Sequence, residues 1–275
     1  MANRSKVITF ASRKGGVGKS TCVTLLARYY AEVEGRKVII IDLDARGGAT
    51  YLLTHVDLGK EDLSISEVIQ VASNQGNFQD VFNQAVIDTG LSKNKNWVDN
   101  GGRLFLLPSK PNLDTVLAST HHSLLGSVIR NISLPDDVLI LIDPGSNSDS
   151  VLSGVSAADV VFLPLLMSQL DVKPVFETLR TILRAQRESE NNKPILGGFI
   201  FNQPRPTKWT EEYIKQYSLV LEEYRNDSGM RCASEDIFLF LNDSSLLARN
   251  AQLELPFRKD FYTFTKKLAD IVHQV

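Results

Sequence analysis

The sequence lacks the features that would tie a protein to an oxidising compartment or a membrane. Its only two cysteines, Cys22 and Cys232, lie far apart and form no CxxC pair, so neither a disulfide framework nor a cysteine-rich metal site is expected. We expect two buried thiols in a reducing environment. No run of about 18 apolar residues occurs, and residues 1–10 do not resemble a signal peptide, which favours a cytoplasmic protein.

An excess of charge of either sign is also missing. The formal net charge is −2 and the pI is about 6.1, so binding to nucleic acid would have to depend on a local basic face. Hydrophobic residues make up 43% of the chain and charged residues 23%, which is ordinary for a globular protein with a full core.

Short apolar runs alternate with helical patterns along the chain. Residues 6–11 and 38–41 are predicted strands, joined by a glycine-rich loop and a predicted helix over 19–33 that stops at Gly35. This strand–helix–strand order implies a parallel sheet. Further strands are predicted at 104–107, 138–142, 160–165 and 196–201. All are continuous apolar runs, which is typical of strands buried on both faces.

One segment interrupts this alternation. Residues 74–102 are polar and hold many Asn and Gly residues, so we predict a surface loop with weak helix there. We find no internal repeat. Residues 1–275 are therefore predicted to form a single α/β domain, a doubly wound, mostly parallel sheet with helices on both faces.

The loop after the first predicted strand carries the most specific signal in the sequence. It reads SRKGGVGKST over residues 12–21 and leads directly into the first helix, where backbone N–H groups and the helix dipole can bind phosphates. Lys19 is predicted to reach the β- and γ-phosphates, Ser20 to ligate Mg²⁺, and Thr21 to contact the α-phosphate. The other nucleotide-binding candidates in the loop are Gly15, Gly16, Val17 and Gly18.

Aspartates follow two of the predicted strands. Asp42 and Asp44 end the strand at 38–41, and Asp143 ends the strand at 138–142. Carboxyl ends of parallel strands meet at one edge of a sheet, and Mg²⁺ prefers oxygen ligands, so these side chains are predicted to lie near the bound phosphates.

The loop departs from the generic GxxxxGK[ST] pattern. Arg13 stands where the first glycine would be, and Lys14 precedes the glycine pair. This variant resembles the deviant Walker A box of the ParA/MinD family of ATPases, closest to the smaller ParA-type partition proteins. The resemblance implies a P-loop ATPase in which Lys14 is the signature lysine that reaches the nucleotide of a partner subunit across a dimer interface.

The same resemblance implies roles for residues further along the chain. Asp44 would position the attacking water, Asp42 would support the magnesium shell, and Asp143 resembles the Walker B aspartate that holds Mg²⁺ through water. Asn202 matches the asparagine that reads the adenine edge, and Pro256 matches a short loop that closes over the base.

One departure follows the first aspartates. Family members commonly continue this segment with Pro-Gln, whereas this chain has Ala45 and Arg46. Arg46 could contact phosphate or DNA, or it could be solvated. The geometry of this loop and the rate of hydrolysis therefore depend on where Arg46 lies.

The function implied is a cytoplasmic, nucleoid-associated ATPase that uses ATP and Mg²⁺ to segregate a plasmid or similar cargo. It would dimerise on ATP, bind DNA non-specifically, and be released when a ParB-like or adaptor protein stimulates hydrolysis. Two basic groups could contact DNA or merely be solvated. They are Lys173, Arg180, Arg184 and Arg187 on a predicted helix at 171–187, and Arg249, Arg258 and Lys259.

Three alternatives to this function are open from the sequence. A MinD-like ATPase would contact a membrane through the last predicted helix, 260–272, but its short and modestly basic pattern favours a core helix. A nucleotide-binding recruiter that hardly hydrolyses ATP would suit the altered Arg46 segment. An iron–sulfur enzyme of the nitrogenase-reductase type needs paired cluster cysteines, which Cys22 and Cys232 do not supply.

Overall fold

The structure is a computed structural model in which nine stretches of the chain are described. They are residues 5–54, 59, 61–90, 101–135, 137–166, 172–202, 208–233, 238–241 and 259–275.

An eight-stranded sheet forms the centre of the described chain, in the order β3-β4-β2-β5-β1-β6-β7-β8. Every neighbouring pair is parallel except β3 and β4, which are antiparallel. The strands are β1 (Val7–Phe10), β2 (Lys37–Leu43), β3 (Ile87–Asp88), β4 (Arg103–Leu107), β5 (Leu139–Pro144), β6 (Val160–Leu166), β7 (Ile195–Asn202) and β8 (Phe238–Leu241).

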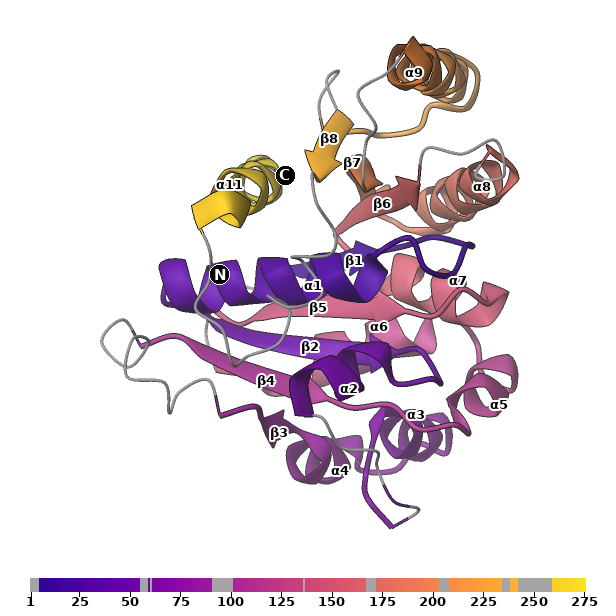
Figure 1. The fold of residues 1–275 in the computed structure, drawn as a ribbon. Helices are drawn as coiled ribbons and strands as arrows, with labels where there is room; N and C mark the ends of the chain where they lie inside the picture. Colours follow the sequence, from indigo (N-terminus) through magenta and orange to yellow (C-terminus); the bar gives the residue numbers. More distant parts are fainter. Residues whose placement is uncertain are drawn as a thin grey trace.

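Helices cover both faces of this sheet (Figure 1), as a doubly wound fold requires. They are α1 (Lys19–Arg28), η1 (Tyr29–Val33, a π-helical turn), α2 (Gly48–Thr54), α3 (Ile65–Ser73), α4 (Phe78–Ala85), α5 (Leu113–Ala118), α6 (Leu124–Asn131), α7 (Ser148–Ala157), α8 (Val172–Glu188), α9 (Lys208–Ser228) and α11 (Lys259–Gln274).

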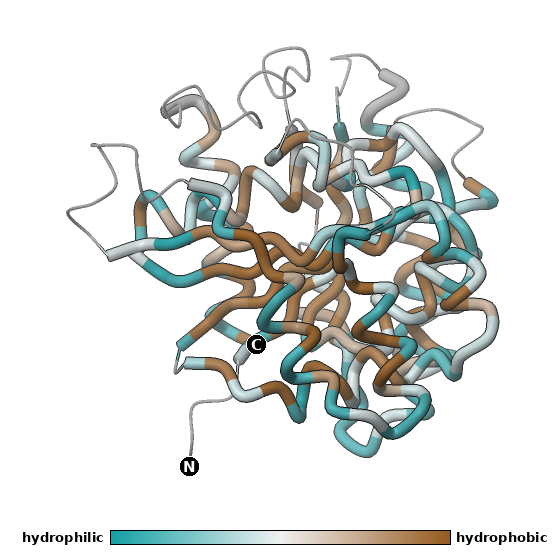
Figure 2. The backbone as a smooth tube through the Cα atoms, turned by 90° about the horizontal axis from the view of Figure 1, so that it is seen from below, coloured by the Kyte–Doolittle hydropathy of each residue, from teal (hydrophilic) through white to brown (hydrophobic). Residues whose placement is uncertain are grey.

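Buried apolar side chains gather in three clusters. One joins α1, α2 and α11 to one face of the sheet, and the other two join α3–α6 and α7–α9 to the opposite face. Figure 2 shows the hydrophobic strands enclosed by more hydrophilic outer segments. Cys22 is buried within the first cluster, whereas Cys232 is only partly buried, and both thiols are free.

The six predicted strands are all present, within one or two residues of the predicted ends. The weak helix predicted within residues 74–102 is present as α4, whereas the short strand β3 in the same segment was not predicted. Phe82 and Ala85 of α4 are buried, and its apolar residues recur three and four positions apart on one side of the helix. The polar residues between them face solvent, which is why the segment resembled a loop.

The apolar side of the last helix packs against the core of the molecule. Phe261, Phe264, Leu268 and Val272 of α11 are buried in the cluster shared with α1. The apolar face that could have met a membrane is therefore covered by this chain. Within the described residues, no helix combines the length and apolar character needed to cross a bilayer.

Strand β7 contains a bulge beside β6. Leu196 pairs with Val161 and Gly198 pairs with Phe162, so Gly197 has no partner residue on β6. A Cβ atom at Gly197 would lie 2.7 Å from the Phe162 ring, and this crowding leaves room for glycine alone.

Candidate functional site

The predicted phosphate loop joins β1 to the start of α1. Gly16 and Gly18 have φ angles of 74° and 93°, in the left-handed region that glycine adopts without strain, and Gly18 is the N-cap of α1. Lys19 is only 6% exposed, and its Nζ donates a hydrogen bond to the Lys14 carbonyl oxygen at 3.2 Å. The Lys19 ammonium thus folds back over the glycine loop, where a phosphate would be wrapped.

The remaining loop residues divide into open and anchoring positions. Gly15 and Gly16 are exposed, which leaves their backbone accessible, while Val17 is buried. Ser20 and Thr21 are half-buried at the start of α1. The structure therefore brings the predicted loop residues together around one helix N-terminus.

Asp143 lies beside Asp42, because β5 and β2 are neighbours and these two residues pair in register. The Asp143 side chain is fully buried, and neither carboxylate oxygen accepts a hydrogen bond from a described residue. The Ser20 hydroxyl lies close by: a Cβ at Gly48 would be 2.8 Å from Ser20 Oγ and 3.8 Å from Asp143 Oδ2.

Electrostatics at Asp143 follow from this burial. Burial raises the pKa of Asp143, and the Asp42 carboxylate raises it further. The Ser20 hydroxyl and the Lys19 ammonium act in the opposite direction, although the hydroxyl falls short of hydrogen-bonding geometry. A buried carboxylate without donors is costly, so Asp143 with the adjacent hydroxyl fits the oxygen ligands of a divalent cation.

Asp42 is also fully buried, but its oxygens are engaged by protein donors. Oδ2 accepts hydrogen bonds from the Thr50 backbone N at 2.7 Å and from Thr50 Oγ1 at 2.8 Å, and Oδ1 accepts one from the Asp44 N at 3.0 Å. Burial raises the pKa of Asp42, and these hydrogen bonds oppose the rise. The observed task of Asp42 is to tie β2 to α2; its place in a magnesium shell stays a prediction.

Asp44 forms an ion pair with Arg46. Arg46 Nη2 lies 2.8 Å from Asp44 Oδ2, while Arg46 Nε and backbone N donate to Oδ1 at 3.1 and 3.0 Å. Burial raises the pKa of Asp44, but the hydrogen bonds and charge of Arg46 outweigh it and hold that pKa below its ordinary value. The sequence did not predict this contact: Arg46 was expected to meet phosphate or DNA, or to be solvated, and the structure pairs it with the predicted water-positioning aspartate.

Asn202 ends β7 directly against the phosphate loop. Its side chain is 5% exposed, and Nδ2 donates to the Val17 carbonyl oxygen at 3.1 Å. Its Oδ1 is buried without a partner among the described residues. A Cβ at Gly18 would lie 2.4 Å from Nδ2, which shows how closely β7 approaches the loop.

Comparison with known proteins agrees with this fold. Residues 5–195 match the profile of the AAA domain. The chain belongs to this AAA-domain family. The chromosome-partitioning ATPase Soj of Treponema pallidum is 25% identical over 218 residues, which cover 77% of each protein. The predicted resemblance to ParA/MinD-type P-loop ATPases is thereby confirmed.

Solved structures confirm the AAA-domain fold over the whole chain. Apo McdA of Cyanothece aligns with a TM-score of 0.74 and 18% identity, covering 98% of this chain and 99% of that one. A putative plasmid partition protein of Borrelia burgdorferi, bound to AMPPNP, aligns with a TM-score of 0.70, 18% identity and the same coverage. At this identity the two structures establish the doubly wound fold.

Three hydroxyl groups that the sequence did not single out stabilise this AAA-domain site. Thr50 holds Asp42, as described above. Ser109 Oγ donates to the Asp44 carbonyl oxygen at 2.6 Å. Ser150 Oγ accepts from the Gly145 N at 2.8 Å and donates to the Leu43 carbonyl oxygen at 2.6 Å, which joins the ends of β2 and β5. No sequence signal distinguished these residues from other Ser and Thr residues.

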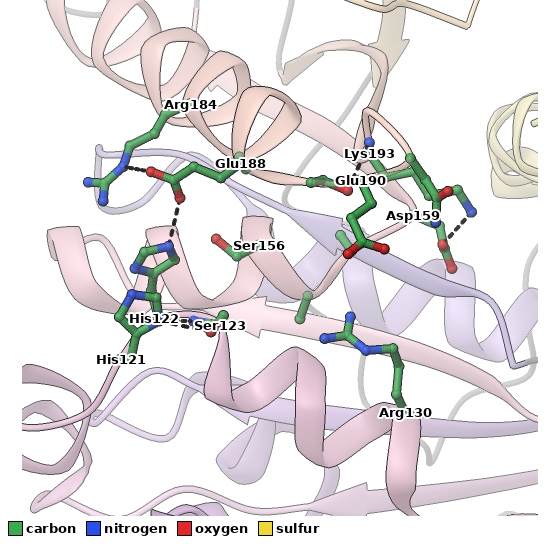
Figure 3. A pocket seen from close by; sticks show the side chains of 15 residues that line it. His121, His122, Ser123, Arg130, Ser156, Asp159, Arg184, Glu188, Glu190 and Lys193 are labelled. Atoms are coloured by element: carbon green, nitrogen blue, oxygen red, sulfur yellow. Dashed lines mark hydrogen bonds and ion pairs between the residues drawn. The ribbon is translucent and has the colours of Figure 1, made fainter.

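A separate cavity of about 670 Å³ lies at the other end of the sheet, between α6, α7 and α8 (Figure 3). Its charges are largely paired with one another: Glu188 contacts both Arg184 and His122, at 2.7 and 2.9 Å, and Lys193 Nζ lies 2.6 Å from Asp159. Asp159 precedes β6, whereas the phosphate loop follows β1, so this cavity is remote from the candidate nucleotide site.

Some predicted positions fall outside the described residues. Pro256, Arg249 and Arg258 are among them, so the base-covering loop and part of the basic group stay predictions. Within the described ranges, no three His, Cys, Asp or Glu side chains are arranged to hold a metal unaided.

Proposed function

We propose that this chain is an ATP-dependent partition or positioning ATPase. The observation that carries the proposal is the fully buried Asp143 carboxylate, whose two oxygens have no partner among the described residues, beside Ser20 at the phosphate loop. A buried carboxylate without hydrogen-bond partners calls for a compensating ion, water or ligand. A divalent cation accompanying a nucleotide on the adjacent loop provides that compensation.

The roles of the nucleotide-binding residues follow from their placement. The Lys19 ammonium neutralises the β- and γ-phosphates, and the exposed backbone of Gly15 and Gly16 donates to phosphate oxygens. Ser20 and Asp143 would hold Mg²⁺, with Asp42 in support, and the ion would supply positive charge next to the phosphates. The unpartnered Oδ1 of Asn202 suits a hydrogen-bond donor such as the adenine amino group.

Hydrolysis is assigned to Asp44, which would orient a water for attack on the γ-phosphate. In the resemblance that guides this proposal, two ATP-loaded subunits face each other and Lys14 completes the partner's site. The dimer would bind DNA non-specifically at the nucleoid, and a ParB-like or adaptor protein would trigger release.

A slowly hydrolysing recruiter is the second candidate, and one observation favours it. The Arg46 guanidinium donates hydrogen bonds to both carboxylate oxygens of Asp44, the residue that would orient the water. The MinD-like membrane alternative has less support, because the apolar face of α11 is buried within the chain.

The test separates the three charged residues by role, using calorimetry and light scattering in ATP and Mg²⁺. Lys19→Ala should bind ATP at least tenfold more weakly, a loss of about 1.4 kcal/mol. Lys14→Ala should still bind ATP but lose dimerisation, hydrolysis or both. Asp44→Ala should accumulate as an ATP-bound dimer, because hydrolysis normally disperses that state.

The exposed Lys37→Ala, at the far end of β2, is the control for loss of a lysine. Unchanged ATP affinity in Lys19→Ala would refute the phosphate-loop assignment. A monomeric Asp44→Ala protein, or a Lys14→Ala protein that dimerises and hydrolyses normally, would refute the dimer mechanism and leave ATP binding intact.

A further inference from the structure

The Asp44–Arg46 pair joins a restrained residue to an accessible one. The Asp44 side chain is 14% exposed, whereas that of Arg46 is 68% exposed. The Asp44 backbone is fixed on both sides, since its N donates to Asp42 and its carbonyl oxygen accepts from Ser109 Oγ and from Gly47 N at 2.7 Å. Only the carboxylate depends on the Arg46 side chain, so movement of that side chain would free Oδ2 and leave Oδ1 bonded to the Arg46 backbone N.

The geometry of the pair limits what the carboxylate can do. Oδ1 accepts from Arg46 Nε and Arg46 N, which uses both of its lone pairs, and Oδ2 accepts from Nη2. One acceptor direction remains on Oδ2. A carboxylate that must hold and orient a water needs free acceptors in the direction of that water. The guanidinium fork therefore competes with the role assigned to Asp44.

Arg46 also lies within electrostatic reach of the phosphate-binding end of the site. Burial lowers the pKa of Lys19, and the Arg46 charge lowers it further. The pKa of Arg46 is raised chiefly by Asp44, and in addition by Asp114 and Asp143. Arg46 thus supplies positive charge to an edge of the sheet where carboxylates gather.

We propose that Arg46 is a positioning residue that restrains the Asp44 carboxylate and thereby keeps hydrolysis slow. This inference rests on the proposed function, because it concerns the reaction assigned to Asp44. The restraint is weak enough to be released, because ion pairs with one exposed partner are worth little in water.

Two substitutions separate the fork from the charge. Arg46→Gln removes both, and Arg46→Lys keeps the charge but cannot make two parallel bonds to the carboxylate. The matched control is Arg103→Gln. Arg103 is exposed at the start of β4, whereas Arg46 follows the end of β2, so the two arginines lie at opposite ends of the sheet's strands.

The first measurement needs no nucleotide. In protein labelled with ¹⁵N-arginine, the Arg46 Nε–H should give a signal that exchanges slowly with water, identified by its loss in Arg46→Lys. Asp44→Ala, which removes the acceptor oxygens, should abolish this protection and leave the other arginine signals in place. An Arg46 Nε–H that exchanges equally fast in the unaltered chain and in Asp44→Ala would overturn the pairing and the proposal with it.

The second measurement is steady-state ATP hydrolysis. Arg46→Gln and Arg46→Lys should raise kcat by about fivefold, with KM unchanged, and Arg103→Gln should leave both constants as they are. Asp44→Asn combined with Arg46→Gln should be as slow as Asp44→Asn alone, because the gain acts through Asp44.

A kcat that falls or does not change in Arg46→Gln would overturn the restraint, and a fall would assign Arg46 to the phosphates instead. A chain that binds no ATP would overturn the proposed function itself, and calorimetry on the unaltered protein distinguishes that case. The arginine signal would still show whether the pair exists.

Discussion

Gly18 shows how closely single residues are constrained at the candidate nucleotide site. It combines a left-handed backbone with the nearest approach of β7, where an added Cβ would lie 2.4 Å from Asn202 Nδ2. Gly16 shares the left-handed backbone, yet nothing lies within 4 Å of its Cβ position. Of these two left-handed glycines, only Gly18 approaches Asn202.

This difference allows a matched prediction about base recognition. Gly16→Ala and Gly18→Ala should both lose about 1–2 kcal/mol of stability from backbone strain, measured by urea unfolding. Only Gly18→Ala should displace Asn202 and reduce the preference for ATP over GTP in calorimetry. Equal ATP-to-GTP affinity ratios in the two variants would argue against a role for Asn202 in reading the base.

The residues of the site were predictable where the signal was local in sequence. The phosphate loop and the strand-end aspartates were of this kind, because their spacing and position follow from one strand and one loop. Thr50, Ser109 and Ser150 were not, since their hydroxyls acquire partners only when distant strand ends meet. The partner of Arg46 was equally hidden, because a side-chain rotamer is set by the folded surroundings.

Among the elements, α11 gives the clearest contrast between its two sides. Leu268 is fully buried against the helices of the first cluster, while the neighbouring Lys267 is exposed. The helix thus stabilises the fold through one face and meets solvent with the other.

Substitutions on the two sides of α11 should differ accordingly. Leu268→Ala should lower the free energy of unfolding by about 2–5 kcal/mol through the cavity it leaves. Lys267→Ala should change it by less than about 0.5 kcal/mol. Urea denaturation measures both values, and a Leu268→Ala protein as stable as the unaltered chain would contradict the core placement of the helix.

Prediction of the elements succeeded for the buried strands and missed the two edge strands. The six buried strands were recognised because parallel strands between two helix layers are apolar throughout. β3 is two residues long, which is too brief a pattern to separate from loop, whereas β8 has four residues, as β1 has, so its length alone does not account for the miss. In α4 only a few apolar residues are buried, and the polar residues that face solvent obscure their helical spacing.

At the scale of the whole molecule, basic side chains are distributed unevenly along α8. Lys173 and Arg184 lie 3.9 and 2.7 Å from Glu177 and Glu188, so their charge is partly neutralised on the helix itself. Arg180 and Arg187 are exposed and form no ion pair with any residue the structure describes. If α8 contacts DNA, these two arginines are the ones available to phosphate groups.

DNA binding by the proposed ATP-bound dimer should therefore respond to Arg180 and Arg187. Mobility shifts with ATP should weaken by at least about tenfold between roughly 50 and 200 mM salt, through counterion release. Replacing both arginines by glutamate should weaken binding and flatten this dependence. Lys37→Glu, at the opposite end of the sheet, is the control; a doubly reversed protein that binds normally would exclude α8 as the DNA surface.

The bulge in β7 has a consequence for how this chain can vary. Leu196 packs in the same cluster as Phe199 and Phe201, which a regular two-residue alternation would not allow, and Ile200 lies in the cluster on the opposite face. Because Gly197 is an extra residue, the odd-numbered residues after it face the side that the even-numbered Leu196 faces. Deleting that single glycine would remove the bulge and leave Phe199, Phe201 and Asn202 on their present faces, because Leu196 and Phe199 would then stand two positions apart. Deleting one residue between Gly198 and Asn202 would instead turn Asn202 away from the phosphate loop. In that part of β7 the loss of one residue is a change of ligand specificity, whereas most substitutions would be a change of packing.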